Sequence, residues 1–199
     1  SASFRRRTSA NGPMPERLLR SRFVGDPIPA ARARQSGAAL HVLAGPAGAG
    51  KSTFAALHWP PGEILSSDTL REMVSGSPGD QSANRSAFAA LHVILEGRLS
   101  RDGLETVVDS TAVEGWARRE LLSAAVKAKR EAILYVFALP VARCVERAQA
   151  RPSPRRVPAD VVQLQSRQLA EGLSDIFRER WRRVLATLDG ATFREVRIE

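Results

Sequence analysis

The chain has 199 residues, and its 30 Lys and Arg residues against 21 Asp and Glu residues give a net charge of +9. With 43% hydrophobic and 26% charged residues it resembles a globular domain, which excludes a wholly disordered or fibrous protein. No apolar run approaches the roughly 18 residues of a membrane span, and no secretory signal is predicted. Cys144 is the single cysteine, so we expect a reducing, cytoplasmic setting, no disulfide within the chain and no membrane partner.

The positive charge is concentrated near the N-terminus. Residues 1–35 contain eight Arg against Glu16 and Asp26, which accounts for six of the nine net charges. Several Gly and Pro residues in the same stretch argue against a continuous fold. We therefore predict a basic, partly disordered arm over residues 1–37, which either binds phosphates or is a solvated leader, and a folded domain over residues 38–199.

From residue 38 onward, short apolar runs alternate with helical patterns. This is typical of an α/β fold in which helices cover both faces of a parallel sheet. Five strands are predicted, at residues 39–44, 63–66, 105–109, 132–138 and 193–198. Helices are predicted at residues 50–58, from near 68, at 82–100, 113–129 and 141–150, with two more before the last strand. Ligands of such sheets bind at the carboxyl ends of the strands, so candidate chemistry is expected there.

Residues 45–52 fit the phosphate-binding pattern G-x-x-x-x-G-K-[ST] letter for letter, between a predicted strand and a predicted helix. The backbone amides of such a loop and the helix N-terminus bind phosphate oxygens. We expect Lys51 to contact the β- and γ-phosphates of ATP or another NTP, and Ser52 to ligate Mg²⁺. The predicted nucleotide-binding residues of the P-loop are Gly45, Ala47, Gly48, Ala49, Gly50, Lys51, Ser52 and Thr53.

Acidic residues follow the second and third predicted strands. Asp68 occupies a position from which a carboxylate can accept the proton of an acceptor hydroxyl, and Arg71, one helical turn later, can bind an acceptor phosphate. The alternative for Asp68 is a helix cap. Asp109 ends the third strand, where a carboxylate either holds Mg²⁺ in a phosphate-loop protein or is simply a polar strand end.

Arginines recur every four residues in the helix predicted at 141–150. Arg143, Arg147 and Arg151 share one helix face and lead into an Arg- and Pro-rich segment over residues 151–158. Such a segment can form a helical, Arg-rich lid that stabilises charge on the transferred phosphoryl group and excludes water. An exposed basic helix with partners such as Glu146 is the alternative.

Taken in order, these motifs resemble the kinase domain of bacterial polynucleotide 5′-kinase/3′-phosphatase enzymes, within the phosphate-loop polynucleotide kinase superfamily. The resemblance runs from about residue 40 to residue 193. It rests on residues 45–53, Ser66-Ser67-Asp68-x-x-Arg71, residues 79–92, Val107-Val108-Asp109-x-Thr111 and Glu146-Arg147-x-x-x-Arg151.

The resemblance implies a role for each matching residue. Asp68 would be the general base for the 5′-hydroxyl, and Arg71 would contact the phosphate on the 3′ side of the acceptor nucleoside. The lid arginines, Arg147 and Arg151, would contact the donor phosphates. The implied catalytic residues are Lys51, Asp68, Arg71 and Arg147, and the implied metal ligands are Ser52 and Asp109.

The implied function is an ATP-dependent polynucleotide 5′-hydroxyl kinase that transfers the γ-phosphate of an NTP to a 5′-OH end of DNA or RNA with Mg²⁺. The family often has Asn where this chain has Ala112, so any contact made by that amide is absent. The phosphatase and ligase modules of the repair enzymes do not fit in 199 residues, which leaves fused or separate repair-enzyme partners open.

Two other functions stay open on the sequence. Zeta-type toxins and antibiotic phosphotransferases share the loop and the Asp after the second strand, so a small-molecule acceptor is the first alternative. A nucleotide-sensing module that binds nucleic acid is the second. The tryptophans, Trp59, Trp116 and Trp181, can stack on a base, but we expect packing roles for them.

Overall fold

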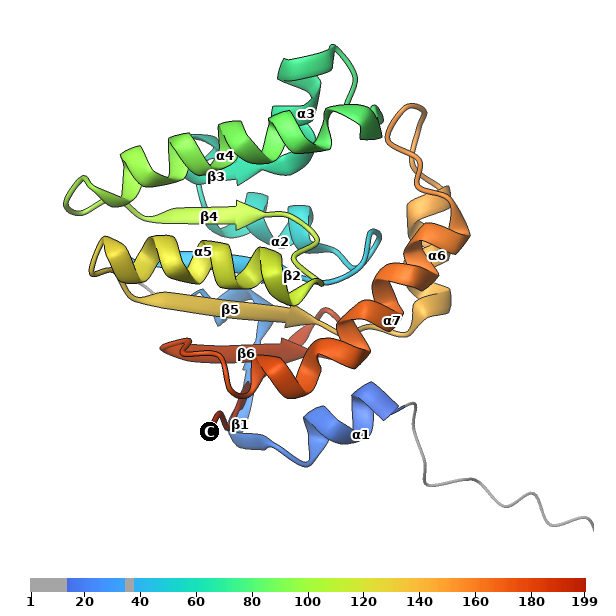
Figure 1. The fold of residues 1–199 in the computed structure, drawn as a ribbon. Helices are drawn as coiled ribbons and strands as arrows, with labels where there is room; N and C mark the ends of the chain where they lie inside the picture. Colours follow the sequence, from blue (N-terminus) through green and yellow to red (C-terminus); the bar gives the residue numbers. More distant parts are fainter. Residues whose placement is uncertain (1–13, 35–37) are drawn as a thin grey trace, which may run out of the picture.

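The computed structural model describes residues 14–34 and 38–199, and these form an α/β fold built on a seven-stranded, mostly parallel sheet (Figure 1). The strands lie in the order β1-β7-β6-β5-β2-β4-β3. Their bounds are β1 Phe23–Pro29, β2 Leu40–Ala44, β3 Ile64–Ser66, β4 Thr106–Asp109, β5 Ala132–Phe137, β6 Arg183–Thr187 and β7 Thr192–Val196. The predicted fold class is confirmed, with two more strands than expected.

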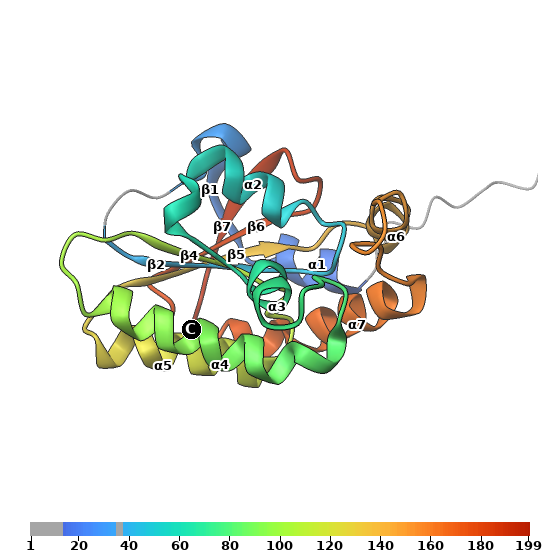
Figure 2. The same cartoon turned by 90° about the horizontal axis from the view of Figure 1, so that it is seen from above.

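Helices cover both faces of the sheet, as Figure 2 shows, with α2 on one face and α4, α5 and α7 on the other. Their bounds are α1 Met14–Arg20, α2 Lys51–His58, α3 Ser67–Ser75, α4 Asn84–Leu99, α5 Gly115–Lys127, α6 Val141–Gln149 and α7 Ala159–Ile176. Each face has its own apolar core, one containing Leu91 and Leu95 of α4 and the other containing Phe54 of α2. No helix of the described residues is long and apolar enough to cross a membrane.

The central strands bring the predicted site residues to one edge of the sheet. Every residue of β2 and β5 is buried, because these strands are covered on both faces and consist almost entirely of apolar residues. In the parallel register Leu43 of β2 pairs with Asp109 of β4, which in turn pairs with Ser66 of β3. The carboxyl ends of these three strands are therefore adjacent.

Two strands differ from the prediction. Residues 14–34 were expected to belong to a partly disordered arm, but they form α1 and β1, and β1 pairs antiparallel with β7. Its prolines are tolerated because β1 is an edge strand, where a missing N–H need not interrupt the sheet. Residues 1–13 and 35–37 of the predicted arm lie outside the described residues.

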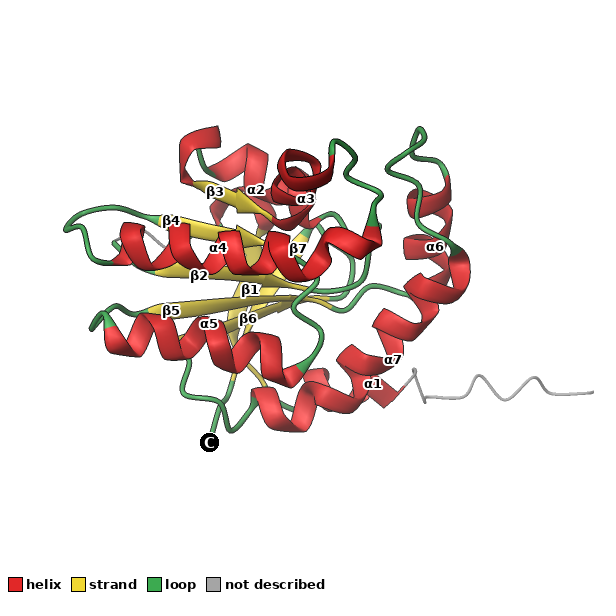
Figure 3. Cartoon of the chain, turned by 45° about the horizontal axis from the view of Figure 1, so that its top comes forward, coloured by secondary structure: helices red, strands yellow, loops and turns green. Residues whose placement is uncertain are grey.

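The expectation of two helices between residue 158 and the last strand is wrong. One helix, α7, is followed by strand β6, which pairs parallel with β5 (Figure 3). The run Val184, Leu185 and Ala186 is fully buried in the sheet, and a run this short does not reveal from sequence whether it is helical or extended.

Candidate active site

The P-loop, residues 45–52, connects β2 to α2 as the sequence predicts. Gly48 has a φ of +80°, and a Cβ atom there would lie 2.1 Å from the carbonyl oxygen of Cys144 in α6. Gly50, with a φ of +97°, immediately precedes the first residue of α2. The loop therefore depends on glycine both for its backbone conformation and for its close approach to α6.

Lys51 lies at the start of α2 and is almost completely buried. Its ammonium group donates hydrogen bonds to the carbonyl oxygens of Gly45, at 2.7 Å, and Pro46, at 2.9 Å. Burial lowers the pKa of Lys51 to about 8, with the Asp109 carboxylate acting in the opposite direction. The Ala47 amide donates to the side-chain oxygen of Gln165 in α7, at 2.8 Å. The Ala47 amide of the loop is therefore oriented so that it donates to an oxygen atom, as a phosphate-binding amide must.

Ser52 and Asp109 are brought together at the end of β4. The Ser52 hydroxyl donates a hydrogen bond to the buried Asp109 carboxylate. Burial raises the pKa of Asp109, and the positive charge of Lys51 acts in the opposite direction. No group of three or more His, Cys, Asp or Glu residues suited to a metal ion occurs in residues 14–34 and 38–199. Mg²⁺ in phosphate-binding sites needs only one or two protein oxygens besides the phosphates and water, so this pair fits such an ion.

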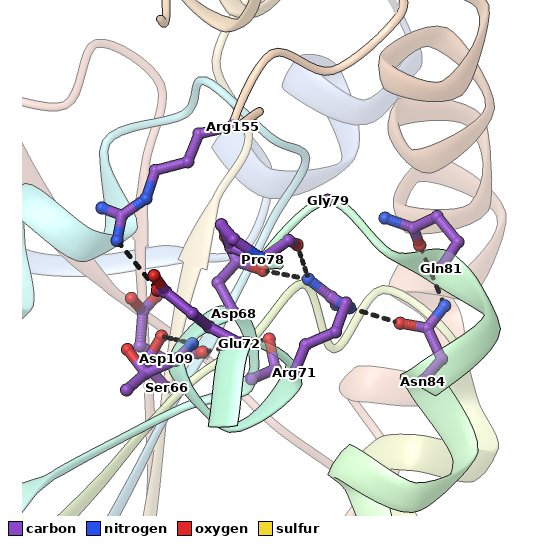
Figure 4. Close-up of polar contacts among 12 residues, drawn as sticks. Ser66, Asp68, Arg71, Glu72, Pro78, Gly79, Gln81, Asn84, Asp109 and Arg155 are labelled. Carbon is purple, nitrogen blue, oxygen red and sulfur yellow. Dashed lines mark hydrogen bonds and ion pairs between the residues drawn. The ribbon is translucent and has the colours of Figure 1, made fainter. Parts of the chain in front are cut away.

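Asp68 and Arg71 project from α3 toward the same region (Figure 4). Ser66 caps this helix by accepting the amide of Thr69 at 3.3 Å, so Asp68 is not the cap. The Arg71 guanidinium donates to Oδ1 of Asp68 at 2.8 Å, to the Pro78 carbonyl at 2.7 Å and to Oδ1 of Asn84 at 2.7 Å. Asp68 is left accessible, with 52% of its side chain exposed.

A cavity of about 910 Å³ connects these groups. The predicted site residues that line it are Ala47, Lys51, Ser52, Asp68, Arg71, Asp109 and Arg151. Arg147 is exposed on α6 and does not line the cavity, and its side chain makes no hydrogen bond or ion pair within the described part of the chain. The remaining predicted loop residues do not line the cavity and form the loop and the first turn of α2; they are Gly45, Gly48, Ala49, Gly50 and Thr53.

The Arg- and Pro-rich segment after α6 reaches across the cavity to α3. Arg155 forms an ion pair with Glu72 at 3.4 Å, and a Cβ atom at Gly79 would lie 2.6 Å from the carbonyl oxygen of Pro154. The sequence indicated a lid here but did not single out these contacts, because they join segments more than 70 residues apart.

A second cavity, of about 640 Å³, adjoins the loop at Pro46. It is lined by residues 138–141 after β5, Leu188 and Asp189 after β6, and residues of α1 and α7. Its walls are largely apolar and it borders the phosphate loop, so it suits a planar aromatic group.

Residues 40–175 match the sequence profile of a protein family described as an AAA domain. The chain belongs to this AAA domain family. The match includes the P-loop, Asp68, Asp109 and the lid segment, and it extends into α7. No curated protein matches the sequence.

Several solved structures share the fold of this AAA domain. The AvrRxo1-ORF1:-ORF2 structure with ATP matches with a TM-score of 0.60 and 14% identity, over 92% of this chain and 65% of that one. The Pnkp1/Rnl/Hen1 RNA repair complex matches with a TM-score of 0.60 and 17% identity, over 84% of this chain and 51% of that one. A candidate kinase from Chloroflexus aurantiacus matches with a TM-score of 0.52 and 21% identity, over 66% and 80%. The chain thus spans about two thirds and about half of the first two.

Proposed function

We propose that this protein is an ATP-dependent polynucleotide 5′-hydroxyl kinase. The observation that carries the proposal is the arrangement of the 910 Å³ cavity, in which Lys51 of the P-loop and the accessible Asp68 carboxylate line the same space. A phosphate-binding loop without such a base suits a nucleotide switch, whereas the two together suit transfer to a hydroxyl group.

On the donor side, the loop amides and Lys51 bind the β- and γ-phosphates of ATP. An incoming phosphate oxygen would replace the Gln165 oxygen as acceptor for the Ala47 amide, and the Lys51 ammonium would exchange its carbonyl partners for phosphate. When bound, Mg²⁺ would be held by the Ser52 hydroxyl and the Asp109 carboxylate, and it would neutralise phosphate charge. The second cavity, next to Pro46, provides room for the base of the donor.

On the acceptor side, Asp68 removes the proton of the attacking hydroxyl. Oδ1 of Asp68 is held by Arg71, which leaves Oδ2 to accept that proton. The hydroxyl oxygen forms a bond to the γ-phosphorus, the bond from that phosphorus to the β,γ-bridging oxygen breaks, and ADP leaves. In this mechanism Arg71 orients the general base, Asp68. The remaining terminal nitrogen of Arg71, Nη2, would bind a phosphate of the acceptor.

The lid contributes charge and excludes water. Arg151 lines the cavity near Lys51, so it is placed to contact the donor phosphates. The predicted role of Arg147 requires α6 to turn toward the cavity when the nucleotide binds, and it stays a prediction. The Pnkp1 neighbour belongs to an RNA repair complex, which supports including RNA ends and repair-enzyme partners among the candidates.

The test is transfer of labelled γ-phosphate from ATP to oligonucleotides with a 5′-hydroxyl, made as DNA and as RNA, beside matched strands that already carry a 5′-phosphate. We expect label only on the 5′-hydroxyl strands. Absence of label on every strand, in a protein shown to bind ATP, would contradict the proposal and direct the search to small-molecule acceptors. If the protein binds oligonucleotides in a salt-sensitive manner but transfers phosphate to no acceptor, it is a nucleotide-sensing module instead.

A further inference from the structure

The cavity has an aromatic wall on the side of α4 and α5. Phe88 of α4 and Trp116 of α5 lie with their ring centroids 5.9 Å apart at an angle of 47°, and His92 lies one turn after Phe88. All three residues line the same cavity as Asp68. The cavity that holds the Asp68 carboxylate therefore also has a wall of tilted aromatic rings.

Trp116 differs from the other two tryptophans of the chain. Trp59 and Trp181 are only 2% and 3% exposed, and their indole N–H groups donate to Glu105 and Glu179. Trp116 is 48% exposed, and its indole makes no hydrogen bond within residues 14–34 and 38–199. The packing role expected from the sequence fits the first two tryptophans and leaves the open ring of Trp116 unexplained.

A cation without a protein partner lies beside this wall. Arg85 of α4 precedes Phe88 by three residues and lines the cavity, and its side chain makes no hydrogen bond or ion pair in the part of the chain that the structure describes. Arg71, by contrast, already donates to three protein oxygens. An accessible ring on α5 and an unpaired guanidinium on α4 thus line one cavity, and such groups bind the base and the phosphate of a nucleotide.

We propose that Trp116 and Phe88 form a stacking subsite for the base of the acceptor nucleotide, and that Arg85 binds a phosphate of that nucleotide. This inference rests on the proposed function and makes it more specific, because the acceptor is then recognised by its terminal base as well as by its hydroxyl. The end of an oligonucleotide and a free nucleoside 3′-phosphate present the same chemistry, and separate titrations with the two ligands in the binding measurement show which one binds more tightly.

The kinetic test compares two 5′-hydroxyl oligonucleotides that differ only at the first residue. One carries a normal nucleoside, and the other carries an abasic tetrahydrofuran residue that keeps the hydroxyl and the phosphate. We expect the wild-type KM to be about tenfold higher for the abasic strand, as loss of one stacked base predicts. Trp116→Ala should raise the KM of the normal strand to the abasic value and leave kcat unchanged, whereas Trp116→Phe should retain most of the discrimination.

A matched control is Val126→Ala, because Val126 lies on the same helix, is 62% exposed and does not line the cavity. It should leave both KM values unchanged. Equal wild-type KM values for the two strands, or a Trp116→Ala variant that still discriminates between them, would overturn the stacking subsite while the proposed kinase function stands.

A binding measurement keeps the inference testable if no strand is phosphorylated. With the donor site saturated by a non-hydrolysable ATP analogue, addition of a nucleoside 3′-monophosphate or an oligonucleotide should quench tryptophan fluorescence in the wild type and not in Trp116→Phe. Arg85→Ala should weaken binding of the nucleoside 3′-monophosphate about tenfold and leave binding of the unphosphorylated nucleoside unchanged. Quenching without transfer would support the subsite and contradict the kinase proposal, and no quenching by any of these ligands would overturn the subsite.

Discussion

Arg71 donates a hydrogen bond of 2.8 Å to Oδ1 of Asp68, one turn earlier on the same helix. The two side chains differ sharply in environment, since 10% of the Arg71 side chain is exposed and 52% of the Asp68 side chain is. A buried guanidinium whose Nε and Nη1 atoms both donate hydrogen bonds to the protein thus fixes the position of an accessible carboxylate. In the proposed mechanism, this contact orients the base that removes the proton of the acceptor.

Replacing Arg71 with Lys tests this positioning. Lys keeps the charge but cannot donate in three fixed directions to Asp68, Asn84 and the Pro78 carbonyl. We expect kcat to fall at least about tenfold and the free energy of unfolding to fall by about 2 kcal/mol, because a buried acceptor loses its donor. Steady-state kinetics and urea unfolding measure both. Asn84→Ala, which removes one acceptor alone, should have smaller effects, and unchanged values in Arg71→Lys would contradict the account.

Gly48 and Gly50 provide a matched pair in the P-loop. Both have positive φ, but a Cβ at Gly48 meets backbone of α6 at 2.1 Å, whereas one at Gly50 meets nothing within 4 Å. Gly50→Ala should therefore cost only the strain of a left-handed residue, about 1–2 kcal/mol of stability. Gly48→Ala should in addition displace the loop and weaken ATP binding at least about tenfold. Calorimetric titration with ATP would refute this if the two variants bound ATP equally well.

His41 makes stability depend on pH. Its side chain is fully buried against Trp59, and burial lowers its pKa to about 4, with Glu105 opposing and Arg34 reinforcing the shift. Between pH 6.5 and 4 the folded chain then binds fewer protons than the unfolded chain, so stability falls as the pH falls through this window. We expect His41 to contribute a loss of about 2 kcal/mol between pH 7 and pH 5.

Urea unfolding at the two pH values measures this loss. His41→Gln cannot take up the proton, so its free energy of unfolding should change by about 2 kcal/mol less than that of the wild type over the same interval. An identical pH dependence in both proteins would show that other groups cause it.

Ala112 has a φ of +40°, in the left-handed region that L-residues with a Cβ avoid, and its carbonyl oxygen accepts from Arg118 at 3.1 Å. The kinase family that the sequence resembles often has Asn at this position, and Asn tolerates such a backbone better than Ala does. Ala112→Gly should raise the free energy of unfolding by about 0.5–1 kcal/mol, since relief of strain exceeds the added entropy of the unfolded chain. Ala125→Gly in the middle of α5 should lower it. Thermal unfolding measures both variants. A Tm below that of the wild type in Ala112→Gly as well as in Ala125→Gly would contradict the assignment of strain to Ala112.

The sequence predicted the parts of the site that depend on local pattern. Spacing and the alternation of strands and helices predict the P-loop, the buried strands β2 and β5, Asp109 at the end of β4, and Asp68 just after β3. Arg147 shows the limit of such reasoning, because its spacing places it on a helix face without saying which way that face points.

Contacts between distant segments could not be predicted. The bonds from Arg71 to Pro78 and Asn84 depend on how the loop after α3 folds back, and the meeting of Phe88 with Trp116 depends on how α4 packs beside α5. The strand β1 was missed because prolines usually interrupt strands, and only an edge position beside β7 accommodates them.

The most direct test of the account is single-turnover transfer from bound ATP to a 5′-hydroxyl oligonucleotide by Asp68→Asn. Asn keeps the size of the side chain but cannot accept the proton, so the rate should fall about 100-fold or more while ATP affinity is unchanged. Asp102→Asn is the control, because Asp102 is also an exposed carboxylate that pairs with an arginine, Arg130, and it does not line the cavity. Wild-type rates in both variants would contradict the role of Asp68 as the base.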